Sequence, residues 1–157
     1  MKDKYYEDYD IGQKYITKSI RIDASSIIEF AEKYDPQPHH LDDAAGKKTA
    51  FRGLVASGWQ TASITMKLFV DSDFTPECGF IGAGLDELSW PIPVRPNDEI
   101  YAVIEVINAR ISKSRPTHGV LKVKTYTYNQ RNEIVQKQVV NLLVPRNPSI
   151  NQHQKGL

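Results

Sequence analysis

The sequence lacks long apolar runs and has almost no excess of charge of either sign. Its 157 residues carry a formal net charge of +1, whereas binding to nucleic acid favours a basic surface. No run approaches the roughly 18 apolar residues of a membrane-spanning helix. The opening sequence, MKDKYYEDYDIGQKY, has no apolar core of the kind a signal peptide needs. We therefore expect a cytoplasmic protein that binds neither nucleic acid nor a membrane.

Cysteine is also scarce, since Cys78 is the single example. No intrachain disulfide can form, and a reducing compartment fits this composition best. Cys78 lies in a loop rich in Pro and Gly without an identifiable base nearby, so a nucleophilic role is not expected. The GFIGAG sequence at 79–84 has neither the spacing nor the following helix of a dinucleotide site. Hydride transfer and phosphoryl transfer therefore have no support.

A chain of this length is one ordinary domain with a sizeable core. We expect a loosely attached N-terminal arm at residues 1–12, a folded domain at 13–145 and a polar C-terminal tail at 146–157. Apolar residues at even positions predict a first strand over residues 15–22.

A short amphipathic helix follows this strand. Asp23, Ser25 and Ser26 are candidates for its N-cap, and Ser26 with Glu29 matches a capping box. The helix should end at Asp35, because the prolines that come next cannot continue it. One more helical turn is predicted over residues 41–45.

The longest helical pattern covers residues 55–70. It is apolar on several sides, with one stripe made of Val55, Trp59, Ala62, Met66 and Phe69. Such a helix is predicted to be buried, wrapped by a sheet. After a loop at 71–84, the apolar period changes to two and predicts strands near 85–92, 100–109, 120–128 and 134–144. A buried helix surrounded by an antiparallel sheet is an α+β fold.

The residues best suited to catalysis lie between Tyr34 and Gln60. Asp35 and His40 share a segment stiffened by two prolines, and a general acid–base pair must be held rigidly within reach of the reacting proton. Taken singly, an aspartate is more often a cap or a solvated residue, and a histidine is more often a surface or core residue. The prediction of a catalytic pair therefore depends on the helix that follows.

Gly58 lies early in the predicted central helix. Backbone N–H groups there have no internal acceptor, and the helix dipole favours negative charge. The Gly58 N–H is thus suited to hold a carbonyl oxygen that becomes an oxyanion or an enolate. Close packing near Trp59 explains this glycine equally well.

Three roles stay open for His39: it points to solvent, touches the substrate, or competes with His40. A metal site is disfavoured, because adjacent ligands without a distant His or Cys make a poor site. The candidate ligands are His39, His40, Asp42 and Asp43, and we expect them to bind no metal ion.

DPQPHH at 35–40, the following LDDAA and the later GLVASGW resemble the signature of the MaoC-like dehydratases, the (R)-specific enoyl-CoA hydratases of the hotdog fold. That signature runs Asp, any residue, Asn or Gln, Pro, an apolar residue and His, and Asp35, Gln37, Pro38 and His40 match it in order. SWPIPVRPNDEI and SKSRPTHG look like later segments of the family. The sequence departs from many members at Tyr34, which replaces Gly, at Ser57, which replaces His, and at His39.

The resemblance implies a single hotdog domain with the 55–70 helix inside an antiparallel sheet, in a homodimer or a larger homo-oligomer. It implies that Asp35 and His40 add water to a trans-2-enoyl-CoA, or remove water from an (R)-3-hydroxyacyl-CoA, while the Gly58 N–H holds the thioester oxygen. Gln37 is expected to position the water or the pair.

Further candidates for substrate binding are Ser57 and Trp59, on either side of Gly58. Lys113 and Arg115 are candidates for the phosphates of coenzyme A, although a solvated hairpin end explains them as well. No cofactor is expected beyond the acyl-CoA or acyl-carrier-protein thioester that serves as substrate.

Two other readings stay open. A hotdog thioesterase would hydrolyse the thioester with a carboxylate, and a non-catalytic acyl-CoA-binding module would keep only the fold. The intact Asp35 and His40 pair favours the hydratase over both.

Overall fold

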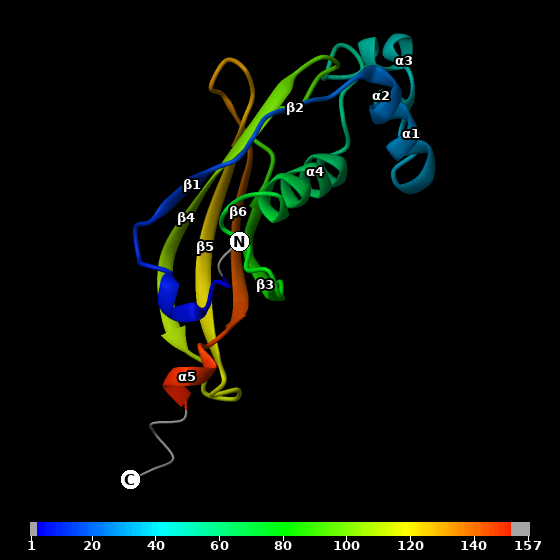
Figure 1. Cartoon of the computed structure of the whole chain (residues 1–157). Coiled ribbons are helices and arrows are strands. Elements are labelled where there is room, and N and C mark those ends of the chain that lie inside the picture. The colour runs from blue at the N-terminus through cyan, green and yellow to red at the C-terminus, as the bar shows by residue number, and fades with distance from the viewer. Residues whose placement is uncertain (1–2, 152–157) are drawn as a thin grey trace.

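The computed structural model describes residues 3–151 (Figure 1). In chain order the elements are η1 (Tyr6–Asp8), β1 (Lys14–Ile16), β2 (Ile20–Arg21), α1 (Ala24–Tyr34), α2 (Pro38–Leu41), α3 (Asp43–Lys47), α4 (Gly58–Val70), β3 (Ile81–Ser89), β4 (Glu99–Ile111), β5 (His118–Tyr128), β6 (Ile134–Pro145) and α5 (Pro148–Asn151).

The strands form one antiparallel sheet in the order β1-β4-β5-β6-β3, with β2 also paired to β4. The sheet curves past α4, while α1, α2 and α3 gather at one of its ends (Figure 1). The α+β arrangement of a central helix against an antiparallel sheet is therefore confirmed.

Two apolar clusters form the core, and α4 contacts both of them. Phe69 belongs to the first, which lies against the inner faces of β4, β5 and β6. Leu68 belongs to the second, which joins α1 and the loops around the helix start. Leu68 and Phe69, which are neighbours in α4, therefore link the apolar cluster at the long strands to the apolar cluster at α1.

The exposed and buried faces of α4 differ from the expectation. The helix begins at Gly58 rather than near residue 55, because the N–H groups of Val55 and Ala56 donate to the carbonyls of His39 in α2 and of Val94. The predicted stripe is only partly buried: Trp59 is 58% exposed and Met66 is 41% exposed, whereas Val55 and Phe69 are buried. The face toward the sheet also carries polar groups, and the Thr65 and Thr127 hydroxyls hydrogen-bond at 2.9 Å. A helix with apolar residues all round does not specify by period which face is buried.

The segment before α1 also differs from the prediction. Two short strands, β1 and β2, replace the single strand expected at 15–22, and Ile16 is 73% exposed. Asp23 is the N-cap of α1, since its carboxylate accepts from the Ser26 N–H at 2.8 Å. The capping box at Ser26 and Glu29 is therefore wrong, whereas the end of the helix at Asp35 is confirmed.

The last three strands match the period-two prediction to within a few residues. β3 begins earlier than expected, at Ile81, and the predicted loop is correspondingly shorter. Register shifts interrupt its pairing with β6 on either side of Gly84, and glycine is common at such bulges. Gly82 and Gly84, which fall in the loop predicted from the sequence, thus lie within an irregular edge strand.

Residues 3–12 are packed onto the domain and are not a loosely attached arm. Tyr9 is 5% exposed in the first core cluster, and its hydroxyl donates to the Phe74 carbonyl at 2.5 Å. Glu7 forms an ion pair of 3.0 Å with Arg146, which ties the first residue after β6 to the same region. Residues 1–2 of the expected arm and 152–157 of the expected tail lie outside the described residues.

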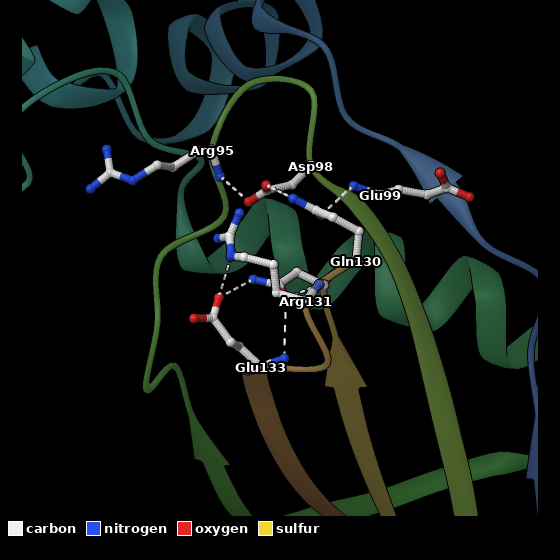
Figure 2. A network of polar contacts seen from close by, with 7 residues as sticks. Arg95, Asp98, Glu99, Gln130, Arg131 and Glu133 are labelled. Atoms are coloured by element: carbon white, nitrogen blue, oxygen red, sulfur yellow. Dashed lines mark hydrogen bonds and ion pairs between the residues drawn. The ribbon is translucent and has the colours of Figure 1, made fainter.

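A polar network joins the loop after β3 to the turn between β5 and β6 (Figure 2). The buried Asp98 carboxylate accepts from the Arg95 N–H and from Gln130 Nε2, each at 2.8 Å. Gln130 in turn accepts from the Glu99 N–H at 3.0 Å. The network fixes the loop that leads into β4, and residues 91–94 of that loop line the pocket described next.

Candidate active site

The turn between α1 and α2 brings Asp35 and His40 together. Asp35 is the C-cap of α1, and Pro38 opens the short helix that carries His40. The chain therefore reverses within a few residues, and His40 Nε2 lies 3.3 Å from Asp35 Oδ2. His40 is 6% exposed, so the imidazole is held in place by its surroundings.

The tautomer of His40 follows from its second contact. Nδ1 lies 2.7 Å from the Val55 carbonyl oxygen, which can only accept a hydrogen bond. Nδ1 therefore carries a hydrogen, and Nε2 of the neutral ring carries the lone pair on the side of Asp35. A proton acceptor and a carboxylate thus face the same space.

Both oxygens of Asp35 receive hydrogen bonds. The Ser57 hydroxyl donates to Oδ2 at 2.7 Å, and Gln37 Nε2 donates to Oδ1 at 2.7 Å. The Ser57 hydroxyl has the largest part in lowering the pKa of Asp35 below its ordinary value; burial opposes it, and Gln37 and the two histidines add to it. Asp35 is accordingly held as a carboxylate.

These contacts give Ser57 a place that differs from the substrate-binding prediction. Ser57 is fully buried, caps α4 by accepting from the Trp59 N–H, and is directed to Asp35. Gln37 contacts Asp35 from the other side and also lines the pocket. Of the two expectations for Gln37, the structure shows contact with the pair.

A pocket of about 450 Å³ opens beside the pair. Its lining combines polar groups with aromatic rings and prolines. Its lining residues are Asp35, Gln37, His39, His40, Phe51, Ala56, Gly58, Trp59, Thr61, Trp90, Pro91, Ile92, Pro93, Val94 and Val135. The combination of an apolar wall with a few converging polar groups is typical of a small-molecule site.

Gly58 is the first residue of α4 and lines this pocket. Among the hydrogen bonds of residues 3–151, its N–H has no acceptor, as expected for the first turn of a helix. A Cβ at this position would lie 2.6 Å from the Trp90 ring. Close packing and a free N–H, which the sequence left as alternatives, therefore occur together.

His39 lies in the pocket wall rather than in solvent. Its ring is 4.2 Å from the His40 ring and 4.9 Å from the Phe51 ring, centroid to centroid. Burial is the main reason why the pKa of His39 is lowered, so its neutral form is favoured. His39 is thus placed to touch a ligand.

The acidic residues considered with the histidines as metal ligands are used elsewhere. Asp42 caps α3 through the Ala45 N–H, and Asp43 accepts from the Leu54 N–H and pairs with Lys47. No group of three or more His, Cys, Asp or Glu suited to a metal ion occurs within residues 3–151.

Over residues 3–151, no helix has the length and apolarity needed to cross a bilayer.

Lys113 and Arg115 are not brought to this pocket within the chain. They lie in the connection between β4 and β5, at the opposite end of the sheet from α1, α2 and α3 (Figure 1). The 13 residues of β4 separate that connection from the loop that lines the pocket, a distance of about 40 Å.

The far wall of the pocket was missed by the sequence reasoning. Trp90 stands against Trp59 with ring centroids 5.4 Å apart, and its indole N–H donates to Gln136 at 2.8 Å. Proline-flanked apolar residues in SWPIPVRPNDEI were the available signal, since they indicate a rigid extended segment. Nothing in the local pattern shows which residues it faces.

Comparison with known proteins gives one family. The family model described as MaoC-like domain matches residues 8–129. A MaoC-like dehydratase from Rhodospirillum rubrum is 43% identical with a TM-score of 0.88, covering 92% of this chain and 98% of that chain. The YdeM protein of Bacillus subtilis (strain 168) is 32% identical over 140 residues, which is 89% of this chain and 98% of that protein.

An (R)-hydratase from A. caviae involved in PHA biosynthesis is 26% identical with a TM-score of 0.70, covering 88% of this chain and 99% of that chain. The predicted hotdog fold is confirmed by these structures. With most of its length matched by the family model, this chain belongs to the MaoC-like domain family.

Proposed function

We propose that this protein is a hydratase or dehydratase that interconverts a trans-2-enoyl-CoA and an (R)-3-hydroxyacyl-CoA. The observation that carries the proposal is the pairing of Asp35 with His40 at 3.3 Å, at a pocket that Gly58 also lines. Similarity to a solved (R)-hydratase supports the reaction class. The chemistry requires no cofactor beyond the thioester substrate.

In this proposal a water molecule in the pocket bridges the two side chains from one side. The lone pair of His40 Nε2 and the Asp35 carboxylate are both acceptors, so a water molecule that donates one hydrogen to each satisfies both. Its oxygen is then free to attack C3 of the enoyl thioester. In this proposal His40 takes a proton from the water as the C3–O bond forms, while the hydrogen bonds from Ser57 and Gln37 keep Asp35 as a carboxylate by lowering its pKa.

The electrons of the C2–C3 double bond move toward the thioester oxygen during this attack. The Gly58 N–H at the start of α4 is suited to stabilise the resulting enolate. The imidazolium then returns its proton to C2 on the same face, which gives the 3-hydroxyacyl thioester and neutral His40. Dehydration is the same path in reverse.

The test uses purified protein with crotonyl-CoA and with longer and branched enoyl-CoAs, followed by loss of the enoyl-thioester absorbance. Asp35→Asn and His40→Ala are measured alongside, with Ser25→Ala on the exposed start of α1 as a control. Turnover without thiol release, lowered by roughly a hundredfold or more in both site variants, supports the proposal. Thiol release would identify a thioesterase, and coenzyme A binding without turnover would identify a binding module.

We also propose that the working form is a homodimer joined through β3 and the exposed face of α4. β3 pairs with β6 on one side, and residues 81–87 are exposed. Ile81 and Leu85 are 47% and 52% exposed on this strand. An exposed edge strand with apolar side chains is prone to pair with another strand, and a second copy of the chain offers a matching edge.

A further inference from the structure

A loop of basic residues borders the mouth of the pocket. Phe51 lines the pocket and packs against His39 at 4.9 Å. Arg52 follows it in the chain, and Arg95 Nη2 donates to the Phe51 carbonyl at 2.6 Å. One arginine therefore contacts a residue of the pocket lining, a second arginine follows that residue in the chain, and Lys48 lies in the same loop.

This loop is held rigidly. Gly46 packs so closely on Gly53 that a Cβ at residue 46 would lie 2.2 Å from the Gly53 carbonyl oxygen. The Leu54 N–H donates to the Asp43 carboxylate at 3.0 Å, and the Thr49 hydroxyl donates to the Gly46 carbonyl at 2.7 Å. Loop 47–53 is consequently a fixed platform.

Arg52 has a backbone conformation that is uncommon for a long side chain. Its φ angle is +59°, in the left-handed region where glycine, asparagine and aspartate are favoured. Such strain persists only where the surroundings enforce it, and it clusters at functional sites. The arginine side chain is exposed, so packing of the side chain does not account for its choice at this position.

The positive charge of the loop is not compensated by its acidic neighbours. Asp42 caps α3 and Asp43 pairs with Lys47, so both carboxylates have other partners. Within residues 3–151, no carboxylate forms an ion pair with Lys48, Arg52 or Arg95. Uncompensated cations beside a pocket favour an anionic ligand.

Taking the proposed function as its basis, we propose that Lys48, Arg52 and Arg95 bind the phosphate groups of coenzyme A. The nucleotide end of the thioester lies over loop 47–53, and the pantetheine arm passes Phe51 to reach Asp35 and His40. Guanidinium groups suit this role because they form paired hydrogen bonds with phosphate oxygens. The free nucleotide thioester, rather than a carrier protein, is the substrate form that this site recognises.

Kinetics with two esters of the same acyl group test the site. Crotonyl-CoA carries the phosphates, and the crotonyl thioester of N-acetylcysteamine has none. In Arg52→Asn, which suits a positive φ and removes the charge, KM for crotonyl-CoA rises about tenfold. Lys48→Gln acts in the same direction, and the loss is confined to the ester with phosphates. Lys18→Gln, at an exposed position between β1 and β2, makes the same change of charge and is the control.

Binding without turnover gives a second readout. Trp59 and Trp90 line the pocket, so their fluorescence reports ligands there. The Kd for free coenzyme A should rise about tenfold in Arg52→Asn, and raising the salt concentration should reduce the difference from the unaltered protein. Dephospho-CoA identifies whether the 3′-phosphate is one of the groups bound.

Failure of this inference is distinguishable from failure of the proposed function. Hydration of both esters, with KM and Kd for coenzyme A unchanged in Arg52→Asn and Lys48→Gln, overturns the phosphate site and leaves the hydratase intact. A rise in KM for crotonyl-CoA in the double variant Lys113→Gln/Arg115→Gln, without a rise in the loop variants, also overturns the phosphate site. That result would place the phosphates at the β4–β5 connection of a second copy of the chain. If crotonyl-carrier protein is turned over efficiently, and equally well by the unaltered protein and the loop variants, coenzyme A is not the preferred carrier. Weakened coenzyme A binding in a protein that hydrates neither ester supports the site and rejects the proposed activity.

Discussion

The Ser57 hydroxyl donates a hydrogen bond of 2.7 Å to the Asp35 carboxylate, across the junction between α1 and α4. Ser57 is also the N-cap of α4, accepting from the Trp59 N–H. One side chain thus fixes the start of the helix that presents Gly58 and holds the acid beside His40. This relationship couples the two halves of the proposed catalytic machinery.

Ser57→Ala should change the pH profile as well as the rate. Loss of the hydroxyl raises the pKa of Asp35 toward its ordinary value, so the most acidic part of the kcat/KM profile, where Asp35 becomes protonated, moves to higher pH. The rate at its optimum should fall by about tenfold or more. Ser63→Ala, which removes an exposed hydroxyl bonded to the Trp59 carbonyl in the same helix, is the matched control. A lower rate with an unshifted pH profile would show that Ser57 acts only as the N-cap of α4 and does not affect the pKa of Asp35.

Asp35 should contribute a pH-dependent part of stability. Its folded-state pKa lies below the ordinary value of 3.8, so the contribution is fully present above that pH and is lost as the pH falls through the folded-state value. Urea unfolding should therefore show a gap between the unaltered protein and Asp35→Asn near neutral pH that narrows below about pH 4. Asp86→Asn, at an exposed ion pair, serves as the control and should show a smaller gap. A gap for Asp35→Asn that is constant with pH would contradict the assignment.

Gly58→Ala should abolish most activity. The added Cβ would lie 2.6 Å from the Trp90 ring, so either the indole or the start of α4 must move. We expect a rate loss of roughly a hundredfold or more and a decrease of about 1–3 kcal/mol in the free energy of unfolding. Adding Trp90→Leu removes this clash, so the double variant should be less destabilised than the sum of the two single variants. If the single variant keeps full activity, the added Cβ is accommodated without moving the N–H at residue 58, and the close packing against Trp90 is not needed for catalysis.

Asp98→Ala should destabilise the protein although it touches no substrate. Its buried carboxylate accepts from the Arg95 N–H and Gln130 Nε2 (Figure 2), and its loss leaves both donors unpartnered. The free energy of unfolding should decrease by about 2–4 kcal/mol. Asp71→Ala, which breaks an exposed ion pair with Lys67, should cost less than about 1 kcal/mol. Denaturant unfolding of both variants measures the difference, and equal values would argue against the network.

Leu85→Glu should separate the proposed dimer. It places a charge on the exposed edge strand, where the leucine is 52% exposed, and burying an unpaired charge at an interface is costly. Sedimentation at several protein concentrations should show a dimer for the unaltered chain and a monomer for the variant. Ile111→Glu, at the far end of β4 with 47% exposure, is the control. A monomeric unaltered chain, or a variant that stays dimeric, would rule out β3 as the interface.

The sequence alone determined those features that depend on neighbouring residues. α1 ends at Asp35 because the prolines after it cannot donate or pack as helix residues. The same prolines keep the segment short and stiff, so Asp35 and His40 were predicted as a pair that the structure places side by side. The later strands followed from the strict period of two in their apolar residues.

Tertiary structure decided what depends on residues far apart in the chain. The buried face of α4 could not be predicted, because apolar residues surround the helix and only the sheet selects a side. Ser57 was expected at the substrate, but the position of α1 directs its hydroxyl to Asp35. Trp90 completes the pocket from a separate loop, while the length of β4 carries Lys113 and Arg115 to the other end. Side-chain periodicity records local geometry, whereas the site is formed by packing between distant segments.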